Sequence, residues 1–477
     1  MRFFSWLETL KLAPSRRRAE RGEARGVRRR SPWARPSVEA LEDRCVPSYS
    51  VIDLGTLGGS YSQGNDINAS GQVVGRSTLS DGTGHAFLWQ NGIMTDLGTL
   101  GTLGAFSSAL GINDFGQIVG YSGGDGGGSS NHAFLLTPED TDGNGTPDRW
   151  FRDSNSDGKN DLMLDLGPNR DAFDVNNAGQ VVGSLWTGLY QHAFRWQNGV
   201  TIDLGTLGGL SSFATAINDA GQVAGTSYTS TGERSAFLWQ GGVMHDIGAS
   251  GASDINQSGQ VAATSYDASL WTPMMPNGTE GSFQSLGALP PDYTDFRETV
   301  STYSIAAGVN DLGTVVGDSR TIHSYADPDG GYEYETSRVF VWAGGVMEDL
   351  LGEGVGLQHA TAINNAGQIV GNGPYSYVFP GQTPNRAFLL TPESATTPFV
   401  NIDDVTITEG NSGTSNAVFT VRLSAASSQA VAVNFATTNG SATASGDYHA
   451  TSGTLTFAPG ETTKTNTVLV NGDRLPE

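Results

Sequence analysis

The chain has few of the features that cross-link a protein, anchor it in a bilayer or charge its surface. Cys45 is the only cysteine, so neither a disulfide within the chain nor a cysteine-ligated zinc site can form. No run of about 20 apolar residues occurs, so the sequence offers no candidate transmembrane helix. Only 16% of the 477 residues are charged, whereas 65 are glycine. Such a glycine content disfavours long helices.

Charge is distributed unevenly along the chain. Residues 1–50 carry twelve Lys/Arg and six Asp/Glu, whereas the remainder carries 14 Lys/Arg and 43 Asp/Glu, a formal charge of −29. An acidic body of this kind repels phosphate backbones, so we expect no nucleic-acid partner. It suits calcium ions or cationic surfaces instead.

Residues 1–48 are expected to form a basic, disordered leader. They contain two triple-arginine runs, at residues 16–18 and 28–30, without apolar periodicity. The apolar stretch near the N-terminus is too interrupted for an ordinary secretory signal. Residues 38–48, Val-Glu-Ala-Leu-Glu-Asp-Arg-Cys-Val-Pro-Ser, resemble the LEPR-XLL sorting segment of large planctomycete surface proteins. The resemblance implies export, and a disordered cytoplasmic tail is the alternative.

A repeated unit occupies residues 49–393. Each copy contains an Asn three residues before a Gly. These asparagines are Asn68, Asn113, Asn176, Asn218, Asn256, Asn310 and Asn364. Successive asparagines are 45, 63, 42, 38, 54 and 54 residues apart. Short apolar runs such as residues 85–89, His-Ala-Phe-Leu-Trp, and residues 94–98, Met-Thr-Asp-Leu-Gly, alternate with glycine-rich turns. This pattern predicts four short antiparallel strands per unit.

Seven four-stranded units at this period predict an all-β fold, a seven-bladed β-propeller. The seventh unit lacks a fourth strand after Leu390, and residues 51–55, Val-Ile-Asp-Leu-Gly, precede the first unit without a partner. If this N-terminal strand completes the seventh blade, the ring closes without exposed sheet edges. An open solenoid, in which the strand stays unpaired, is the alternative. The fifth and sixth units lack the His-Ala-Phe triplet, so we expect their blades to be irregular.

The segments Asp-Leu-Gly-Thr-Leu-Gly-Gly, Ile-Asn-x-x-Gly-Gln-Val-Val-Gly and His-Ala-Phe-Leu-Trp together resemble the HAF family of extracellular repeats. The resemblance implies an extracellular location and supplies no enzymatic activity. His85, His132 and His192 share one repeat position, and we favour a structural role because equivalent positions in different blades lie far apart. A set of repeated aspartates is interpreted as residues of strand-end turns: Asp53, Asp96, Asp165, Asp203, Asp246 and Asp349. A set of repeated tryptophans is interpreted as core between blades: Trp89, Trp196, Trp239, Trp271 and Trp342.

An insertion at residues 138–162 contains two loops typical of calcium sites. The first comprises Asp140, Asp142, Asn144, Thr146 and Asp148, and the second comprises Asp153, Asn155, Asp157, Lys159 and Asp161. Side-chain oxygens at positions 1, 3, 5 and 9, a carbonyl at position 7 and a glycine at position 6 suit a hard cation. Without the Glu at position 12 of an EF-hand, the loops resemble dockerin or thrombospondin type 3 calcium loops. We expect structural calcium, and an ion-free acidic loop is the alternative.

A second domain is expected over residues 400–477, after a linker at residues 394–399. Its apolar and polar residues alternate in short strands, which predicts a β-sandwich. Residues 408–413, 446–448, 457–461 and 472–477 closely resemble a Calx-beta domain. The resemblance places Glu409, Asp447, Asp473, the carbonyl of Leu475, and Glu477 at calcium-ligand positions. The sequence stops one or two strands before that sandwich would finish, so we expect a truncated, Ig-like domain.

These features favour a non-enzymatic protein that is secreted or attached to the cell surface and acts in adhesion or cell communication. Its cofactor would be structural calcium, and its partner an unidentified protein or glycan. A secreted propeller enzyme, such as a glycosidase or a lyase, is the alternative. Such an enzyme would need acidic or basic groups that are unique to one blade and converge in space.

Overall fold

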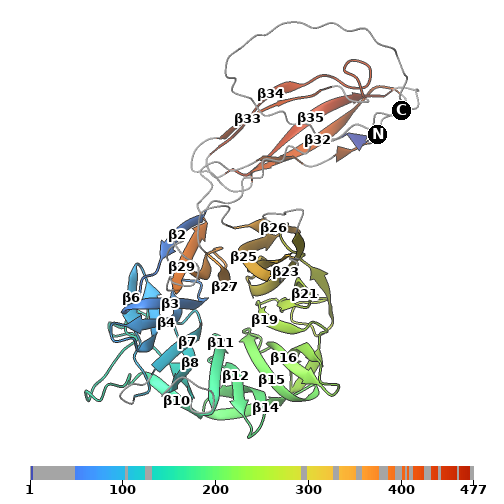
Figure 1. Ribbon diagram of the computed structural model, residues 1–477. Coiled ribbons are helices and arrows are strands. Elements are labelled where there is room, and N and C mark those ends of the chain that lie inside the picture. Colours follow the sequence, from blue (N-terminus) through green and yellow to red (C-terminus); the bar gives the residue numbers. More distant parts are fainter. Residues whose placement is uncertain are drawn as a thin grey trace. The chain divides into compact units, whose positions relative to one another are not determined.

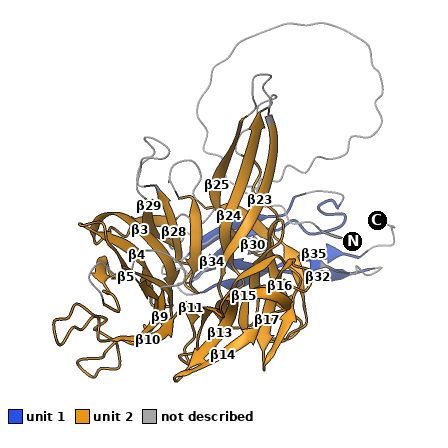
Figure 2. Ribbon diagram, turned by 60° about the horizontal axis from the view of Figure 1, so that its bottom comes forward, with its two compact units in different colours: residues 1–48, 393–477 blue, residues 49–392 orange. Residues whose placement is uncertain are grey.

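The computed structural model describes residues 2–3, 49–101, 106–123, 131–291, 298–325, 332–350, 357–374, 385–392, 400–402, 405–407, 412–423, 431–438, 442–458 and 461–472. Every regular element in these ranges is a β-strand. The described residues contain no helix that is long and apolar enough to cross a membrane. The chain divides into two compact units, residues 49–392 and residues 1–48 with 393–477 (Figure 2).

Residues 49–392 form seven four-stranded antiparallel sheets around a common axis, which confirms the predicted seven-bladed propeller (Figure 1). Blades one and two comprise β3 (Gly58–Ile67), β4 (Val73–Leu79), β5 (Gly84–Gln90) and β6 (Ile93–Asp96), then β7 (Phe106–Ile112), β8 (Ile118–Gly123), β9 (His132–Leu136) and β10 (Met163–Pro168). Blades three and four comprise β11 (Arg170–Val175), β12 (Val181–Trp186), β13 (Gln191–Gln197) and β14 (Val200–Gly205), then β15 (Gly208–Ile217), β16 (Val223–Thr229), β17 (Arg234–Gln240) and β18 (Val243–Asp246). Blades five and six comprise β19 (Gly251–Ile255), β20 (Val261–Thr264), β21 (Ala268–Pro273) and β22 (Gly281–Ser285), then β23 (Glu298–Val309), β24 (Val315–Tyr325), β25 (Tyr332–Ala343) and β26 (Val346–Asp349).

The seventh blade joins the two ends of the repeat region. It comprises β27 (His359–Ile363), β28 (Ile369–Pro374), β29 (Asn385–Pro392) and the N-terminal β2 (Tyr49–Asp53). Strand β2 pairs with β29 in a register that sets Val51 opposite Leu390. The ring is therefore closed as predicted, and the open solenoid is excluded.

Apolar side chains between neighbouring blades form the core. The repeated Phe87, Phe134, Phe194, Phe237 and Phe340 are fully buried. Each burial stabilises the fold by roughly 1.5–3 kcal/mol. The repeated tryptophans are at most 8% exposed and pack against the preceding blade, as Trp239 does against Val182. Their expected role as core between blades is confirmed.

The repeated Asn turns form a closed ring of hydrogen bonds around the axis. The side-chain amide of Asn68 donates to the backbone carbonyl of Asn113 in the next blade, at 3.1 Å. The same bond recurs at all seven blade interfaces, and Asn364 of blade seven returns to the carbonyl of Asn68 at 3.1 Å. Each Asn also accepts from the backbone N–H four residues later, as Asn68 does from Gln72. The Asn-x-x-Gly-Gln repeat thus links every blade to its neighbour.

A second ring of hydrogen bonds lies one residue further along each turn. There the backbone N–H of one blade donates to the side chain of the next, as Ala69 does to Asp114 at 2.9 Å. Six interfaces have this bond, in which each residue of the following series donates to the next: 69, 114, 177, 219, 257, 311 and 365. The seventh interface lacks it because Ala69 has no side-chain acceptor for Asn365.

Blades five and six have the full four strands, so the expected irregularity affects strand length only. The strands of blade five have four to six residues. In blade six, β23, β24 and β25 have 12, 11 and 12 residues and form a projecting arm (Figure 2). Cross-strand stacking of Tyr325 on Tyr332, with ring centroids 4.6 Å apart, supports this arm.

The second unit contains two small sheets and a short strand pair. One sheet comprises β30 (Val400–Ile402), β32 (Thr414–Leu423) and β35 (Thr463–Asn471), and the other comprises β33 (Val431–Ala436) and β34 (Ser452–Phe457). β31 (Val405–Thr406) pairs with β1 (Arg2–Phe3), a short strand in the segment for which we expected no structure. Phe457 is fully buried among apolar residues of both sheets.

Candidate metal site in the blade-two insertion

The insertion lies between β9 and β10 and is attached to blades one and two through Trp150. The indole of Trp150 is only 8% exposed and belongs to the same apolar cluster as Leu97 of blade one and Phe134 of blade two. Its Nε1–H donates to the carbonyl of Gly116 at 3.0 Å. The insertion therefore shares its core with the propeller.

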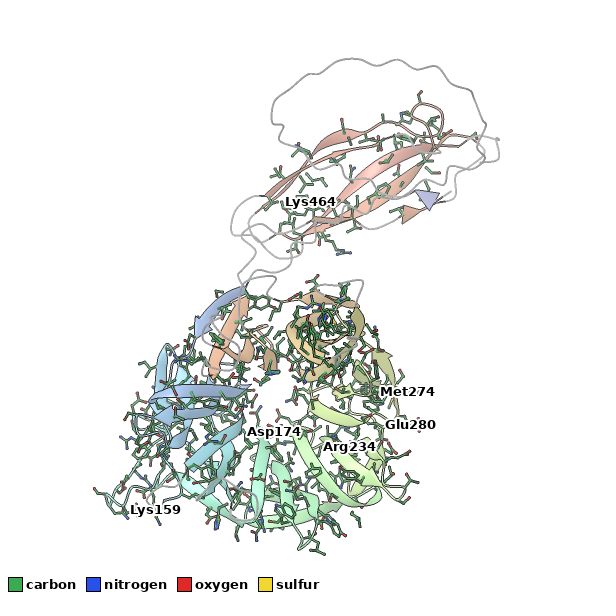
Figure 3. The ribbon with its side chains drawn as sticks, in the orientation of Figure 1. Lys159, Asp174, Arg234, Met274, Glu280 and Lys464 are labelled. Atoms are coloured by element: carbon green, nitrogen blue, oxygen red, sulfur yellow. The ribbon has the colours of Figure 1, made fainter. Side chains whose placement is uncertain are left out.

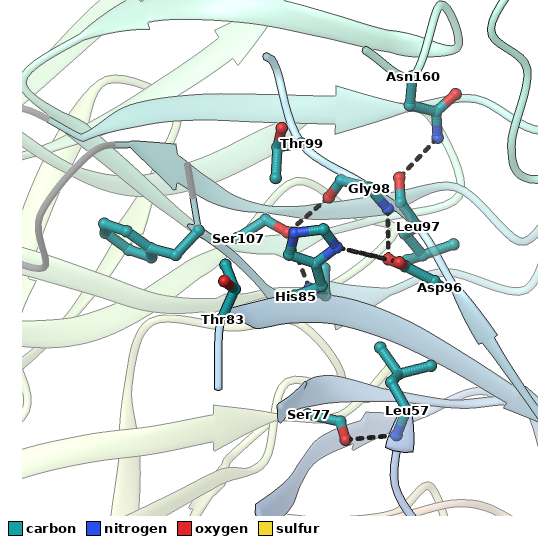
Figure 4. Close-up of polar contacts among 12 residues, drawn as sticks. Leu57, Ser77, Thr83, His85, Asp96, Leu97, Gly98, Thr99, Ser107 and Asn160 are labelled. Carbon is teal, nitrogen blue, oxygen red and sulfur yellow. Dashed lines mark hydrogen bonds and ion pairs between the residues drawn. The ribbon is translucent and has the colours of Figure 1, made fainter. Parts of the chain in front are cut away.

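Asn160 forms a second attachment. Its side chain is buried, and its Nδ2 donates to the carbonyls of Leu97 at 2.9 Å and Trp150 at 2.8 Å. Its Oδ1 accepts from the backbone N–H groups of Arg152 and Leu162, both at 3.1 Å. Figure 4 shows the bond to Leu97 beside the end of β6. Asn160 thus fixes the second calcium-type loop to blade one.

The first loop has the backbone shape that a calcium loop requires. Asp140, at position 1, accepts from the N–H of Gly143 and from that of Gly145, both at 2.7 Å. Gly145, at position 6, has a φ of +88°, a left-handed conformation that favours glycine. Asp148, at position 9, accepts from the hydroxyl of Thr141 at 2.6 Å. The loop therefore turns back on its first carboxylate through its own backbone N–H groups.

The second loop repeats this shape. Asp153, at position 1, accepts from the N–H of Asp157 at 3.1 Å and from that of Gly158 at 3.0 Å. Gly158, at position 6, has a φ of +81°. Asp161, at position 9, accepts from the N–H of Ser154 at 2.9 Å. The two sequence-predicted loops are therefore alike in backbone.

The loops differ in how they gather charge. Asp140, Asp142 and Asp148 each place a carboxylate oxygen within 4.8 Å of the others, the one such trio found among the described residues. In the second loop Asn155 takes position 3, and the Nε of Arg152 lies 3.6 Å from the carboxylate of Asp161. The first loop therefore fits a calcium ion better, because no basic side chain among the described residues forms an ion pair with its three carboxylates.

Hydrogen bonding keeps two of these carboxylates ionised. The N–H of Gly145 is the main cause that lowers the pKa of Asp140. The hydroxyl and N–H of Ser154 lower the pKa of Asp161. Both side chains are exposed, so they are available as anionic ligands near neutral pH. Thr146 and Lys159 occupy position 7, where only the backbone carbonyl would be used.

The expected calcium ligands of the C-terminal unit lie mostly outside the described residues. Glu409, Asp473, Leu475 and Glu477 belong to this undescribed set. Asp447 is described, and its carboxylate accepts from the N–H of Thr443 at 2.6 Å. Its own carbonyl accepts from the N–H of Asn471 at 2.8 Å, which joins the turn to the end of β35.

The repeated histidines pair with the repeated aspartates of the same blade. Nδ1 of His85 lies 2.9 Å from Asp96 Oδ1, and the same Asp oxygen accepts from the N–H of Gly98 at 2.7 Å (Figure 4). The His132–Asp165 and His192–Asp203 pairs have the same geometry, each at 2.9 Å. Asp53, Asp165, Asp203 and Asp246 likewise accept from the glycine two residues later. The strand-end role predicted for the aspartates is therefore observed, and each paired His links two strands.

Sequence reasoning did not identify three aspartates near the propeller axis. Asp66, Asp174 and Asp254 lie two residues before the ring asparagines of blades one, three and five. Figure 3 shows Asp174 at the inner end of its blade. The sequence contains a signal for them, since the other blades have Gly or Ala at this position: Gly111, Ala216, Gly308 and Ala362.

The two small sheets and the Asp447 turn of the C-terminal unit can be compared with known domains. Residues 393–477 match the Calx-beta domain. The match covers this unit alone, so it identifies one domain of the chain. Calx-beta domains are generally associated with calcium, and the match supports that part of the expected architecture.

Two searches concerned the whole chain. The search of characterised proteins found no match. Among solved structures, the crystal structure of a triple arginine-to-alanine mutant of AofleA from Arthrobotrys oligospora aligns with 63% of this chain and 88% of its own. The identity is 13% and the TM-score 0.31.

Proposed function

We propose that this protein is a non-enzymatic, extracellular or cell-surface binding protein that calcium stabilises, with a role in adhesion or cell communication. The observation that carries the proposal is the first insertion loop, where Asp140, Asp142 and Asp148 bring three carboxylates together. Trp150 and Asn160 connect that insertion to blades one and two, so an ion bound there would stabilise the propeller. The Calx-beta domain supports the calcium-linked surface role.

The partner would be a surface protein or glycan. The HAF-like repeats and the LEPR-XLL-like leader support export of the chain, because both resemble segments of extracellular proteins. Treating intact cells with a protease tests this location, since an exported chain is cleaved and an internal one is not.

Thermal unfolding of the full chain, in chelator and across a calcium titration, tests the calcium hypothesis. Tryptophan fluorescence reports mainly on the propeller here, because seven of the nine tryptophans lie in residues 49–392 and none lies in residues 393–477. Calcium at about 100 times its Kd should stabilise the fold by about 2.7 kcal/mol. Asp142→Asn should remove more of this gain than Asp157→Asn, because only the first loop gathers three carboxylates.

Asp81→Asn is the matched control. Asp81 is an exposed loop residue that accepts from the N–H of Thr83, outside both calcium-type loops. It should leave the calcium response intact. Identical midpoints in chelator and in saturating calcium would reject the insertion as a calcium site.

A second candidate function, a secreted glycosidase or lyase, is favoured by a cluster in which a His–Asp pair joins blades six and seven and an arginine lies beside it. Nδ1 of His359 lies 2.7 Å from Asp318 Oδ2, and the His359 side chain is 45% exposed. Arg320 lies 3.7 Å from Asp318 and 3.0 Å from Glu335. An imidazole oriented by a carboxylate in this way is suited to proton transfer.

Assays on purified cell-surface polysaccharides distinguish the two functions. An enzyme would release reducing ends or unsaturated products, and His359→Ala would abolish that release while leaving the unfolding midpoint within a few degrees. If wild type and His359→Ala are equally inactive while both bind calcium, the enzyme alternative is rejected.

A further inference from the structure

Three aspartates connect neighbouring blades close to the propeller axis. Asp66 accepts from its neighbour Ile67 through Oδ1 at 2.7 Å and from Ile112 of blade two through Oδ2 at 2.8 Å. Asp174 joins blades three and four in the same way, with Oδ2 2.8 Å from the nitrogen of Ile217. Asp254 joins blades five and six, with Oδ2 2.8 Å from the nitrogen of Val309. Each carboxylate therefore holds two blades together.

The backbone explains how these side chains reach the next blade. In every inner strand the pairing register shifts just before this position, as between Ala172 and Asp174 of β11. A bulge of this kind redirects the side chain that follows it. The small residues of the other blades leave room for the aspartates: a Cβ on Gly111 would lie 2.9 Å from the Cα of Asp174.

The charged groups around these carboxylates are mainly other carboxylates. Asp174 and Asp254 repel the charge of Asp66, and Asp254 and the turn residue Asp219 repel that of Asp174. The turn residue Asp311 repels the charge of Asp254. Asp114 occupies the equivalent turn of blade two. The remaining ionisable residues of the inner strands lie five or more residues before the ring asparagines: Tyr61, Arg170, Asp171, Glu298, Tyr303 and His359.

We propose that Asp66, Asp174 and Asp254 form a proton-dependent clasp across alternate blade interfaces. Proton uptake weakens the N–H bonds that each carboxylate accepts, but it removes a half-buried negative charge that other carboxylates repel, so the ring becomes more stable as the surroundings become mildly acidic. The clasp is a property of the propeller alone and does not depend on calcium or on the proposed surface function. It would make the stability of the protein respond to pH in the range where ordinary surface aspartates no longer titrate.

The environment of the three side chains gives the direction of this response. Burial is the main cause that raises the pKa of each, and for Asp174 it raises the pKa from 3.8 to about 7. The three side chains are half-buried, and the protein that surrounds them replaces enough water for desolvation to dominate.

The sign of the pH effect follows from proton binding. Between the ordinary pKa of 3.8 and about 7, the folded state holds a proton on Asp174 that the unfolded chain has released. Unfolding therefore releases protons, and stability falls as the pH rises through this range. The stabilising effect of the proton is complete below about pH 4 and is lost once the pH exceeds the folded pKa.

Urea unfolding of the full chain at pH 5 and pH 8, followed by tryptophan fluorescence in chelator, tests the clasp. The chelator keeps calcium from contributing, so failure of the calcium hypothesis would not affect the result. The wild-type midpoint should be higher at pH 5 than at pH 8. Asp174→Asn should reduce the difference, and the variant with all three aspartates replaced by asparagine should abolish most of it.

Asp81→Asn is again the control, because hydrogen bonding to Thr83 lowers the pKa of this exposed residue and should leave the pH 5 to pH 8 difference unchanged. A wild-type midpoint that is equal or lower at pH 5 would overturn the proposal, as would an undiminished difference in the triple variant. If the variants do not fold, proton release is measured on the wild type. Unfolding at pH 6 in weak buffer with an indicator dye should release protons, and zero release or net uptake overturns the clasp.

Discussion

The insertion and the propeller axis both carry three neighbouring carboxylates, but their surroundings differ. In the insertion, Asp140, Asp142 and Asp148 are exposed, and backbone N–H groups of the loop stabilise their charge. At the axis, Asp66 and its two counterparts are surrounded by protein and by one another. The pKa of Asp140 is therefore lowered, whereas the pKa of Asp174 is raised to about 7.

If both proposals hold, burial decides whether an acidic cluster in this protein takes up calcium or protons. Exposed, ionised carboxylates can compensate a divalent ion and remain accessible to it. Half-buried carboxylates that repel one another gain more from taking up protons. The same residue type thus serves a calcium hypothesis at the edge of the ring and a proton hypothesis at its axis.

We expect the largest loss of stability from a substitution that breaks the attachment of the insertion to the propeller. Trp150→Ala removes a buried indole from the cluster shared by blades one and two and should lower the free energy of unfolding by about 3–5 kcal/mol. Calcium should then stabilise the propeller less, because the loops lose their main attachment. Urea unfolding followed by circular dichroism measures both effects.

Trp186→Ala is the matched control for this change. Trp186 is 36% exposed at the end of β12, so its loss should have a much smaller effect. Equal losses in the two variants would contradict the role given to Trp150.

We expect a smaller effect from a substitution that stabilises the turns around the axis without adding charge, which separates hydrogen bonding there from the effect of the carboxylates. Ala69→Asn supplies the missing side-chain acceptor for the N–H of Asn365 and should complete the second ring. The gain should be about 0.5–1.5 kcal/mol, the usual net value of one hydrogen bond. Because the new group is neutral, urea unfolding should show the same gain at pH 5 and pH 8, with and without calcium.

Ala220→Asn is the control for this change. Ala220 is an exposed turn residue of blade four, and the preceding Asp219 already takes part in the second ring of hydrogen bonds. It should leave the midpoint almost unchanged. A gain in this variant that matches Ala69→Asn would show that the ring is not the cause.

The sequence was sufficient for features that depend on local pattern. The Asn spacing and the unpaired residues 51–55 predicted seven blades and their closure, and the oxygen spacing predicted both insertion loops. It was insufficient where function depends on ring closure. Asp66, Asp174 and Asp254 are far apart in the chain and come within electrostatic range of one another only because the inner strands surround one axis. The Arg152–Asp161 contact, which weakens the second loop, also depends on how the insertion folds.

The strand that closes blade seven sets the order in which the propeller can be completed. The hydroxyl of Ser50 bonds to the carbonyl of Thr391, 341 residues away in the chain. During synthesis, which proceeds at about 5–20 residues per second, β2 must wait unpaired until β29 has left the ribosome. A contact between such distant residues forms slowly because closing a long loop is entropically unfavourable. Ring closure is therefore the step of folding at which we expect a chaperone to protect the chain.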